Sequence, residues 1–140
     1  FYTSIGSAIP GALGVQTANP KARPIVLVGD GAAQMSLTEL STIVRRGLNP
    51  IVFIMNNDGY TTERFLSDGP FNDIQPWNYS KICGLIGGGW GATVVTEEEL
   101  ALACQYAIDS KGLAVIDVKL DRDDVSDGLR RLTEILAKRI

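Results

Sequence analysis

The sequence contains no histidine among its 140 residues. This absence excludes Ser-His-Asp and Cys-His catalysis from the chain itself, together with zinc sites built on imidazole. Any acid–base chemistry must therefore use carboxylates, a bound cofactor or another polypeptide. Cysteine is also scarce: Cys83 and Cys104 form no CxxC motif, so we expect two buried, reduced thiols. Reduced thiols are typical of a cytoplasmic protein.

Long apolar runs and long basic runs are missing too. No apolar stretch approaches the roughly 18 residues that indicate a membrane helix, and no signal-peptide pattern is present. Lys and Arg total 13 against 16 Asp and Glu, a net charge of −3, and no basic run exceeds a pair. We therefore expect no membrane partner and no nucleic-acid partner.

The composition that remains is that of an ordinary globular protein, with 45% hydrophobic residues, 15 glycines and 6 prolines. A chain of 140 residues corresponds to about one domain and can bury a core without disulfide bonds. Its first residue is Phe1 and not a methionine, and the residues that follow have the pattern of a segment from the interior of a protein. We therefore expect residues 1–140 to be one domain and a fragment of a longer polypeptide.

Hydrophobic periodicity predicts alternating strands and helices. The β-branched runs Ile25–Val28 and Ile51–Met55 are typical of buried parallel strands. Between them the sequence predicts one helix, which starts at a capping box, Ser36–Glu39, and stops at Gly47. Further helices are predicted over 5–18, 96–111 and 126–138, and a strand over 113–120. This order predicts an α/β fold, a three-layer sandwich in which helices cover both faces of a parallel sheet.

One long segment, residues 56–77, interrupts the alternation. It is polar and contains several glycines and prolines. Loops of this length in compact domains are usually functional or disordered. Its aromatic residues favour an ordered, packed loop: Tyr60, Phe65, Phe71 and Trp77.

Two polar turns follow the first two predicted strands. Gly29-Asp30-Gly31 follows the first, and Asn56-Asn57-Asp58-Gly59 follows the second, with 24 residues between the two turns. In a right-handed β-α-β unit the carboxyl ends of both strands lie at one edge of the sheet, where α/β proteins bind ligands.

A phosphate site with a bridging metal explains the chemistry of these turns. Glycines on both sides of Asp30 allow close approach of the backbone, and amides ahead of the following helix can hold a phosphate. The Asp30 carboxylate would repel that phosphate unless a divalent cation, held also by the Asn57 side chain, lies between them. Mg²⁺ suits these hard oxygen ligands. The spacing alone leaves a plainer alternative, in which the glycines only form turns and Asp30 only caps a helix.

Other phosphate-binding motifs fit less well. The P-loop pattern is absent, and the run that begins at Gly29 lacks the third glycine of the dinucleotide fingerprint.

Taken together, the two turns resemble the thiamine-diphosphate signature, Gly-Asp-Gly followed by Asn-Asn. Val28–Met35 and Asn56–Glu63 resemble the pyruvate/indolepyruvate/phenylpyruvate decarboxylase branch, and residues 4–14 and 69–77 extend the likeness over almost the whole chain. The resemblance implies the thiamine-diphosphate-binding fold and the C-terminal diphosphate-binding domain of a non-oxidative decarboxylase. Such an enzyme converts a 2-oxo acid to an aldehyde plus CO2.

The resemblance also implies a metal and diphosphate site. It assigns Mg²⁺ to the side chains of Asp30 and Asn57 and to the backbone carbonyl of Gly59. Gly31 and Ala32 would lie against the diphosphate. Because many relatives have Ser or Thr where Ala32 stands, a side-chain hydrogen bond to phosphate is missing here and backbone amides must replace it.

The remaining implied roles surround the organic part of the cofactor. Ile5 matches the apolar residue that bends the cofactor, although it could instead belong to the core, and the Thr3 carbonyl matches the acceptor for the aminopyrimidine amine. Glu63 matches the catalytic glutamate beside the reacting carbon, with its ionisation tuned by burial and by phosphate. The alternative for Glu63 is a solvated position on a short helix. Thr62 matches a residue of the substrate pocket and is smaller than the isoleucine often found there, which leaves room for an aryl or indole group unless Trp77 or groups outside this chain fill it.

The full set of implied cofactor-binding residues is Thr3, Ile5, Gly29, Asp30, Gly31, Ala32, Asn57, Gly59, Tyr60, Thr61 and Thr62. The activating glutamate and a pair of histidines would lie on an N-terminal pyrimidine-binding domain of the same or a neighbouring subunit. The resemblance thus implies a homodimer or homotetramer, inactive without that domain, with apolar surface exposed around Ile5, Ile9 and residues 60–77.

Two classes of alternative function stay open. One is another thiamine-diphosphate enzyme, such as an acetolactate-synthase-like carboligase, a benzoylformate decarboxylase or an oxalyl-CoA decarboxylase. The other is a cofactor-binding module without catalysis. The run Gly59-Tyr60-Thr61-Thr62-Glu63 favours the pyruvate/indolepyruvate branch.

Overall fold

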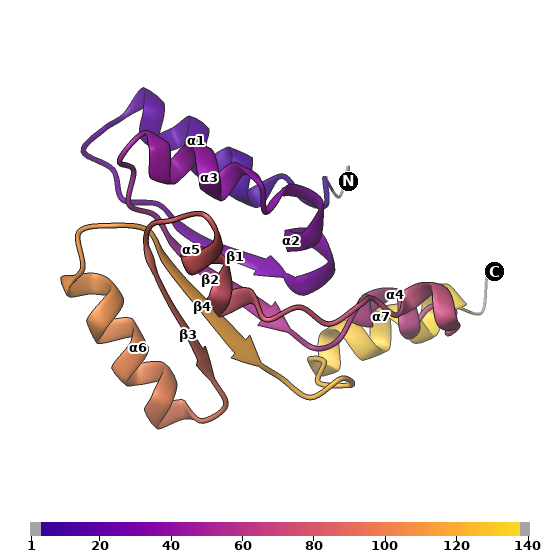
Figure 1. Cartoon of the computed structure of the whole chain (residues 1–140). Coiled ribbons are helices and arrows are strands. Elements are labelled where there is room, and N and C mark those ends of the chain that lie inside the picture. Colours follow the sequence, from indigo (N-terminus) through magenta and orange to yellow (C-terminus); the bar gives the residue numbers. More distant parts are fainter. Residues whose placement is uncertain (1–3, 138–140) are drawn as a thin grey trace.

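A computed structural model describes residues 4–137, which form a parallel sheet in the order β1-β2-β4-β3 (Figure 1). The strands are β1 (Ile25–Gly29), β2 (Ile51–Asn56), β3 (Trp90–Val94) and β4 (Ala114–Lys119). The helices are α1 (Ala8–Ala18), α2 (Asp30–Ser36), α3 (Glu39–Arg45), α4 (Thr61–Arg64), α5 (Ile82–Leu85), α6 (Glu97–Asp109) and α7 (Asp127–Ala137), and two 3-10 turns are η1 (Pro70–Asn72) and η2 (Tyr79–Lys81). The predicted α/β class is confirmed.

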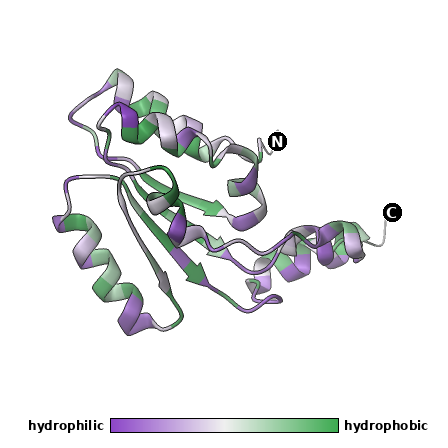
Figure 2. Cartoon of the chain, viewed as in Figure 1, coloured by the Kyte–Doolittle hydropathy of each residue, from purple (hydrophilic) through white to green (hydrophobic). Residues whose placement is uncertain are grey.

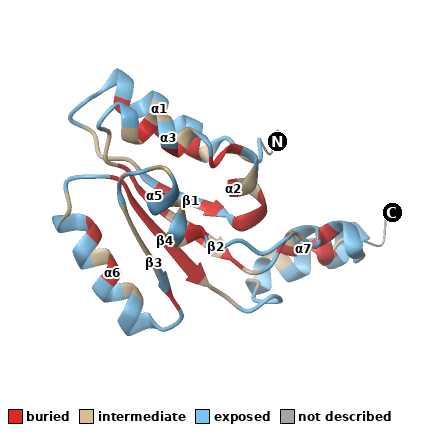
Figure 3. Ribbon diagram, in the orientation of Figure 1, coloured by how far each residue is buried: buried red, intermediate tan, exposed pale blue. Residues whose placement is uncertain are grey.

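Successive side chains of the strands enter two different cores. On one face, Val52 and Ile54 of β2 pack with residues of α1, α2 and α3. On the other face, Ile116 of β4 packs against Ala103 and Ala107 of α6. Figure 2 shows the strands as strongly hydrophobic, and Figure 3 shows buried residues concentrated on the sheet and on the inner sides of the helices that flank it. The sheet is thus the middle layer of a three-layer arrangement.

The helices α4 and α7 lie together beyond the end of the sheet (Figure 1). The guanidinium of Arg130 in α7 lies 5.1 Å from the centre of the Phe65 ring, directly after α4. No helix among residues 4–137 is long and apolar enough to cross a membrane.

Strand positions agree closely with the sequence analysis. The observed ends of β1, β2 and β4 differ from the predicted ends by one residue at most. The sequence pattern predicts no helix or strand over residues 78–95, yet they contain η2, α5 and the edge strand β3. The predicted loop 56–77 is ordered, as expected, and includes α4 and η1.

The prediction of a single helix between β1 and β2 is wrong. Two helices occupy this stretch, and Ser36 ends α2 instead of capping a helix. Leu37 and Thr38 keep right-handed helical backbone angles, so the chain never adopts the extended conformation that a cap requires. The Ser36 hydroxyl is buried without a hydrogen-bond partner among the described residues.

A capping box is present at the start of α6. Thr96 precedes this helix in an extended conformation, and its hydroxyl oxygen accepts a hydrogen bond from the Glu99 amide at 3.2 Å. The Glu99 carboxylate in turn accepts one from the Val95 amide at 2.8 Å. Two backbone donors at the helix start are thereby satisfied by side chains.

We expect Thr96→Ala to lower the free energy of unfolding by about 1 kcal/mol, because the Glu99 amide loses its acceptor. Thr38→Ala is the matched control: Thr38 precedes α3 but makes no capping hydrogen bond through its side chain. Urea denaturation of the two variants and the parent measures both effects. Equal losses in the two variants would contradict a specific capping role for Thr96.

Candidate functional site

The site lies at the carboxyl ends of β1 and β2. Their register pairs Gly29 with Met55, so the two polar turns leave neighbouring strands side by side. A cavity of about 260 Å³ opens there. Its lining residues are Ile5, Gly29, Asp30, Gly31, Ala32, Met55, Asn57, Gly59, Tyr60, Thr61, Thr62 and Glu63.

This lining includes every residue proposed for the site from sequence except Thr3, which lies outside the described residues. Met55 is the one lining residue that sequence reasoning missed. Its position at the predicted carboxyl end of the strand Ile51–Met55, directly before the polar turn, was the signal that could have identified it.

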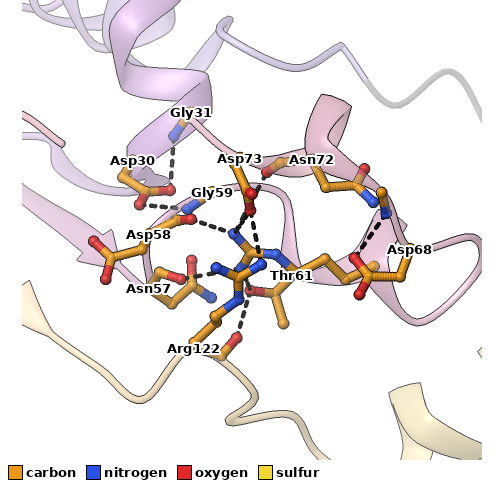
Figure 4. Close-up of polar contacts among 12 residues, drawn as sticks. Asp30, Gly31, Asn57, Asp58, Gly59, Thr61, Asp68, Asn72, Asp73 and Arg122 are labelled. Carbon is orange, nitrogen blue, oxygen red and sulfur yellow. Dashed lines mark hydrogen bonds and ion pairs between the residues drawn. The ribbon is translucent and has the colours of Figure 1, made fainter. Parts of the chain in front are cut away.

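Asp30 links the two turns. Its side chain is almost fully buried, with 1% of the residue exposed. One carboxylate oxygen accepts a hydrogen bond from the Gly31 amide at 2.7 Å, and the other accepts one from the Gly59 amide at 3.0 Å (Figure 4). Burial raises the pKa of Asp30, and the charge of Asp58 adds to this rise, whereas the amide hydrogen bonds lower it. The site thus contains a buried carboxylate that a nearby cation would stabilise in its charged form.

The second turn has a left-handed backbone. Asp58 has a φ of 58° and Gly59 a φ of 127°, which is a region that favours glycine. A side chain at Gly59 would collide with the carbonyl oxygen of Asn72 and with the Arg64 guanidinium. Glycine is therefore required at position 59 both by its backbone angle and by its neighbours.

Gly31 is required by close packing. A Cβ atom at this position would lie 2.5 Å from the Tyr60 ring, so the absence of a side chain lets Tyr60 pack against the start of α2. The first turn of an α-helix leaves backbone N–H groups without helical acceptors. In α2 this turn contains Gly31 and Ala32, and both line the cavity.

The donor set fits a magnesium ion that a ligand shares. Asp30 supplies a carboxylate, Asn57 a side-chain amide oxygen and Gly59 a backbone carbonyl, all of them hard oxygen donors. No group of three or more Asp, Glu, His or Cys residues within residues 4–137 can hold a metal. A cation here would therefore need further donors. Mg²⁺ is commonly bound by one or two carboxylates together with phosphate oxygens, so the site fits this ion.

The residues on the outer part of the cavity are exposed. Ile5 is 50% exposed, so its alternative assignment to the core is wrong. Glu63 lies on α4, lines the cavity and is exposed, so the described residues do not provide the burial that we expected around it. Thr62 is exposed as well, whereas Thr61 is buried and its hydroxyl donates to the Arg122 carbonyl at 2.9 Å.

The expected exposed apolar surface is present only in part. Phe71 and Trp77 are exposed, as is Ile5. Ile9 is fully buried, so its predicted exposure is wrong: it lies in α1 and packs in the core between that helix and the sheet. Cys83 is buried and burial raises its pKa to about 11, while Cys104 is only half-buried, which corrects the expectation of two buried thiols.

Gly59→Ala should lower the free energy of unfolding by about 2 kcal/mol or more, because the new methyl group combines backbone strain with a collision. Gly112→Ala is the control, since a Cβ there meets no atom within 4 Å and the backbone is not left-handed. Chemical denaturation monitored by tryptophan fluorescence compares the two. A Gly59→Ala variant as stable as Gly112→Ala would refute the tight packing of this turn.

Comparison with known proteins agrees with this geometry. Residues 1–118 match the family described as "Thiamine pyrophosphate enzyme, C-terminal TPP binding domain". Pyruvate decarboxylase 1 of Arabidopsis thaliana is 40% identical over 134 residues, which cover 91% of this chain and 22% of that protein. Alpha-keto-acid decarboxylase of Mycobacterium tuberculosis is 44% identical over 89 residues, or 62% of this chain and 16% of that one.

A solved structure shows the same fold. The thiamine diphosphate-dependent 4-hydroxybenzoylformate decarboxylase of Rhodococcus jostii RHA1 superposes with a TM-score of 0.77 at 25% identity, over 86% of this chain and 24% of that chain. This chain thus spans less than a quarter of each of these relatives. From the family match and the cavity at the strand ends, we conclude that the chain belongs to the C-terminal TPP-binding domain family of thiamine pyrophosphate enzymes.

Proposed function

We propose that residues 1–140 are the C-terminal diphosphate- and metal-binding domain of a non-oxidative 2-oxo-acid decarboxylase. The observation that carries this proposal is the convergence of Asp30, Asn57, Gly59 and Glu63 on one cavity at the ends of β1 and β2. The names of the relatives, pyruvate and alpha-keto-acid decarboxylases, support the reaction class.

The inner part of the cavity would bind the charged part of the cofactor. Asp30, the Asn57 side chain and the Gly59 carbonyl would hold Mg²⁺, and the backbone of Gly31 and Ala32 at the start of α2 would lie against the diphosphate. Ala32 has no hydroxyl, so phosphate recognition here depends on backbone donors. The metal resolves the conflict between a buried carboxylate and an anionic ligand.

The outer part of the cavity would serve the organic rings and the substrate. Ile5 lines the cavity and is half exposed, which supports a role beneath the cofactor, and the Thr3 carbonyl would accept the cofactor's amine. When bound, thiamine diphosphate supplies the nucleophilic carbon and the electron sink that carboxylate loss needs. Glu63 would hold or transfer the proton that replaces CO2 in the aldehyde product.

The small size of the Thr62 side chain indicates the class of substrate. Its side chain is exposed and lines the same cavity as Glu63. A threonine leaves more space than the larger isoleucine found in many relatives. We therefore propose a 2-oxo acid with an aryl or indolyl group as the preferred substrate.

The site needs a second polypeptide segment. Without histidine, the chain relies on Glu63 alone for proton transfer near the substrate, and we propose that an N-terminal pyrimidine-binding domain supplies the activating glutamate. The apolar side chains of Ile5, Phe71 and Trp77 are exposed and would be covered in such an assembly. We propose a homodimer or homotetramer in the cytoplasm, inactive when this domain is isolated.

The metal-bridge proposal predicts that Asp30→Ala abolishes cofactor binding, because the cation loses the one buried carboxylate among the described residues that line the cavity. Calorimetric titration of the intact enzyme with thiamine diphosphate, with Mg²⁺ and with excess chelator, tests this directly. Asp109→Ala, at the end of α6 on the other face of the sheet, should bind normally. Undiminished binding in Asp30→Ala, or in chelator, would overturn the metal-bridge proposal.

Removal of the Glu63 carboxyl should affect turnover and not binding. In the intact enzyme, Glu63→Gln should lower kcat by about 10²-fold or more, the scale of a lost acid or base, while cofactor affinity stays within about a few-fold. Glu98→Gln, exposed on the first turn of α6, is the matched control. Steady-state assays with pyruvate and with an aryl 2-oxo acid measure kcat.

These assays also separate the two classes of function. A parent enzyme that binds thiamine diphosphate but releases no CO2 from either substrate would be a binding module without catalysis. A normal kcat for Glu63→Gln in an active parent would remove Glu63 from the mechanism.

A further inference from the structure

Arg64 is a buried cation next to the metal-binding turn, and the proposed mechanism does not use it. It is the last residue of α4, directly after Glu63, and only 4% of its side chain is exposed. A buried charge is costly unless it is paired and hydrogen-bonded. Its contacts therefore show what this guanidinium holds in place.

Both terminal nitrogens of Arg64 donate to the turn that carries the metal ligands. Nη1 donates to the Asn57 carbonyl at 3.2 Å, and Nη2 donates to the Asp58 carbonyl. Two successive carbonyls are thus held by one planar group. Only arginine among the side chains offers five N–H donors in such a rigid fork.

The same guanidinium ties this turn to the following loop. Nη2 also donates to the Asn72 carbonyl at 3.5 Å and to the Asp73 carboxylate at 3.1 Å. Hydrogen bonding and charge from Arg64, together with the charge of Arg122, hold the pKa of Asp73 below its usual range. The carboxylate therefore stays ionised near neutral pH and anchors the fork.

The metal-binding turn is held from two opposite sides. On one side, Asp30 accepts the hydrogen bond of the Gly59 amide at 3.0 Å. On the other side, the Arg64 guanidinium and the Asn72 carbonyl fill the space where a Gly59 side chain would lie. Since Asp58 and Gly59 have left-handed backbone angles, the turn needs such contacts to keep one conformation.

We propose that Arg64 is a positioning residue, which fixes the Asn57–Gly59 turn in the conformation that binds the metal. The inference rests on the proposed function, because the ligand that this turn serves is the Mg²⁺ of the cofactor site. Arg64 touches neither metal nor substrate in this assignment. It acts through the two carbonyls and through the backbone that presents Asn57 and Gly59.

The test compares Arg64→Lys with a matched variant, Arg23→Lys. Lysine keeps the charge but loses the fork. Arg23 also donates to backbone carbonyls, those of Asn49 at 2.7 Å, Ala107 at 2.8 Å and Ile108 at 2.9 Å. It precedes β1 and so lies at the amino-terminal ends of the strands, whereas the cavity lies at their carboxyl ends. If each guanidinium only links backbone segments, the lysine substitution should have the same effects at both positions.

Two quantities are measured in the intact enzyme, well below its melting temperature. One is the Kd of Mn²⁺, used as a spectroscopic substitute for Mg²⁺, by electron paramagnetic resonance with saturating thiamine diphosphate. The other is the Tm without metal or cofactor. We expect both variants to lower Tm, but only Arg64→Lys to weaken Mn²⁺ binding, by about ten-fold or more, the scale of one lost charge-assisted hydrogen bond. Arg23→Lys should stay within about two-fold.

The outcomes separate this inference from the function on which it rests. Absence of cofactor-dependent Mn²⁺ binding in the parent overturns the proposed function, and the inference with it. Normal binding in the parent and in a folded Arg64→Lys variant overturns the inference alone. Should Arg64→Lys fail to fold, the same comparison is made with Arg64→Gln, whose neutral side chain avoids an unpaired buried charge.

Discussion

The hydrogen bonds of the Asp30 carboxylate are the interactions on which the site depends. Parallel pairing of β1 and β2 brings Gly29 beside Met55, but it does not determine how the two following turns meet. Asp30 joins them, because one oxygen binds the Gly31 amide of its own turn and the other binds the Gly59 amide of the next. This link requires burial of the Asp30 carboxylate, which disfavours the charged form and raises its pKa. A divalent cation would oppose this effect by favouring the charged form.

The surrounding loops are arranged to support this link. The Tyr60 amide donates to the Asn72 carbonyl at 2.9 Å, and Asp73 forms an ion pair with Arg122 at 2.7 Å. The end of β4 also joins the site, since the Leu120 amide donates to the Asn56 carbonyl at 2.9 Å. Segments far apart in the sequence therefore converge on the turn after β2. This explains why a polar loop of such length is ordered.

The sequence predicts β1 and β2 and the position of the cavity at their carboxyl ends, because the signals there are local. The β-branched runs determine β1 and β2, and the turns after them follow from the parallel geometry of a β-α-β unit. The cap at Thr96 was also predictable, because the preceding chain is extended. At Ser36 the same pattern fails, since α2 has already begun at Asp30 and the chain stays helical through Thr38.

Other features could not be predicted because they depend on contacts remote in sequence. In the sequence, Arg64 lies in a polar segment, which is typical of a solvent-exposed charge. In the fold, the carbonyls of Asn57, Asp58 and Asn72 surround its guanidinium. β3 escaped prediction because it is an edge strand whose residues Trp90, Gly91 and Ala92 are half-buried, with no clear alternation. Burial at these places is decided by the assembled fold and not by local periodicity.

The two halves of the cavity differ in how complete they are. Asp30 and Gly59 are buried and hydrogen-bonded, so the half assigned to metal and diphosphate is already formed by this chain. Ile5, Thr62 and Glu63 are exposed, so the half assigned to the rings and the substrate faces solvent. Because Glu63 is exposed, we propose that a second domain covers this half of the cavity and that the reaction requires the assembled enzyme.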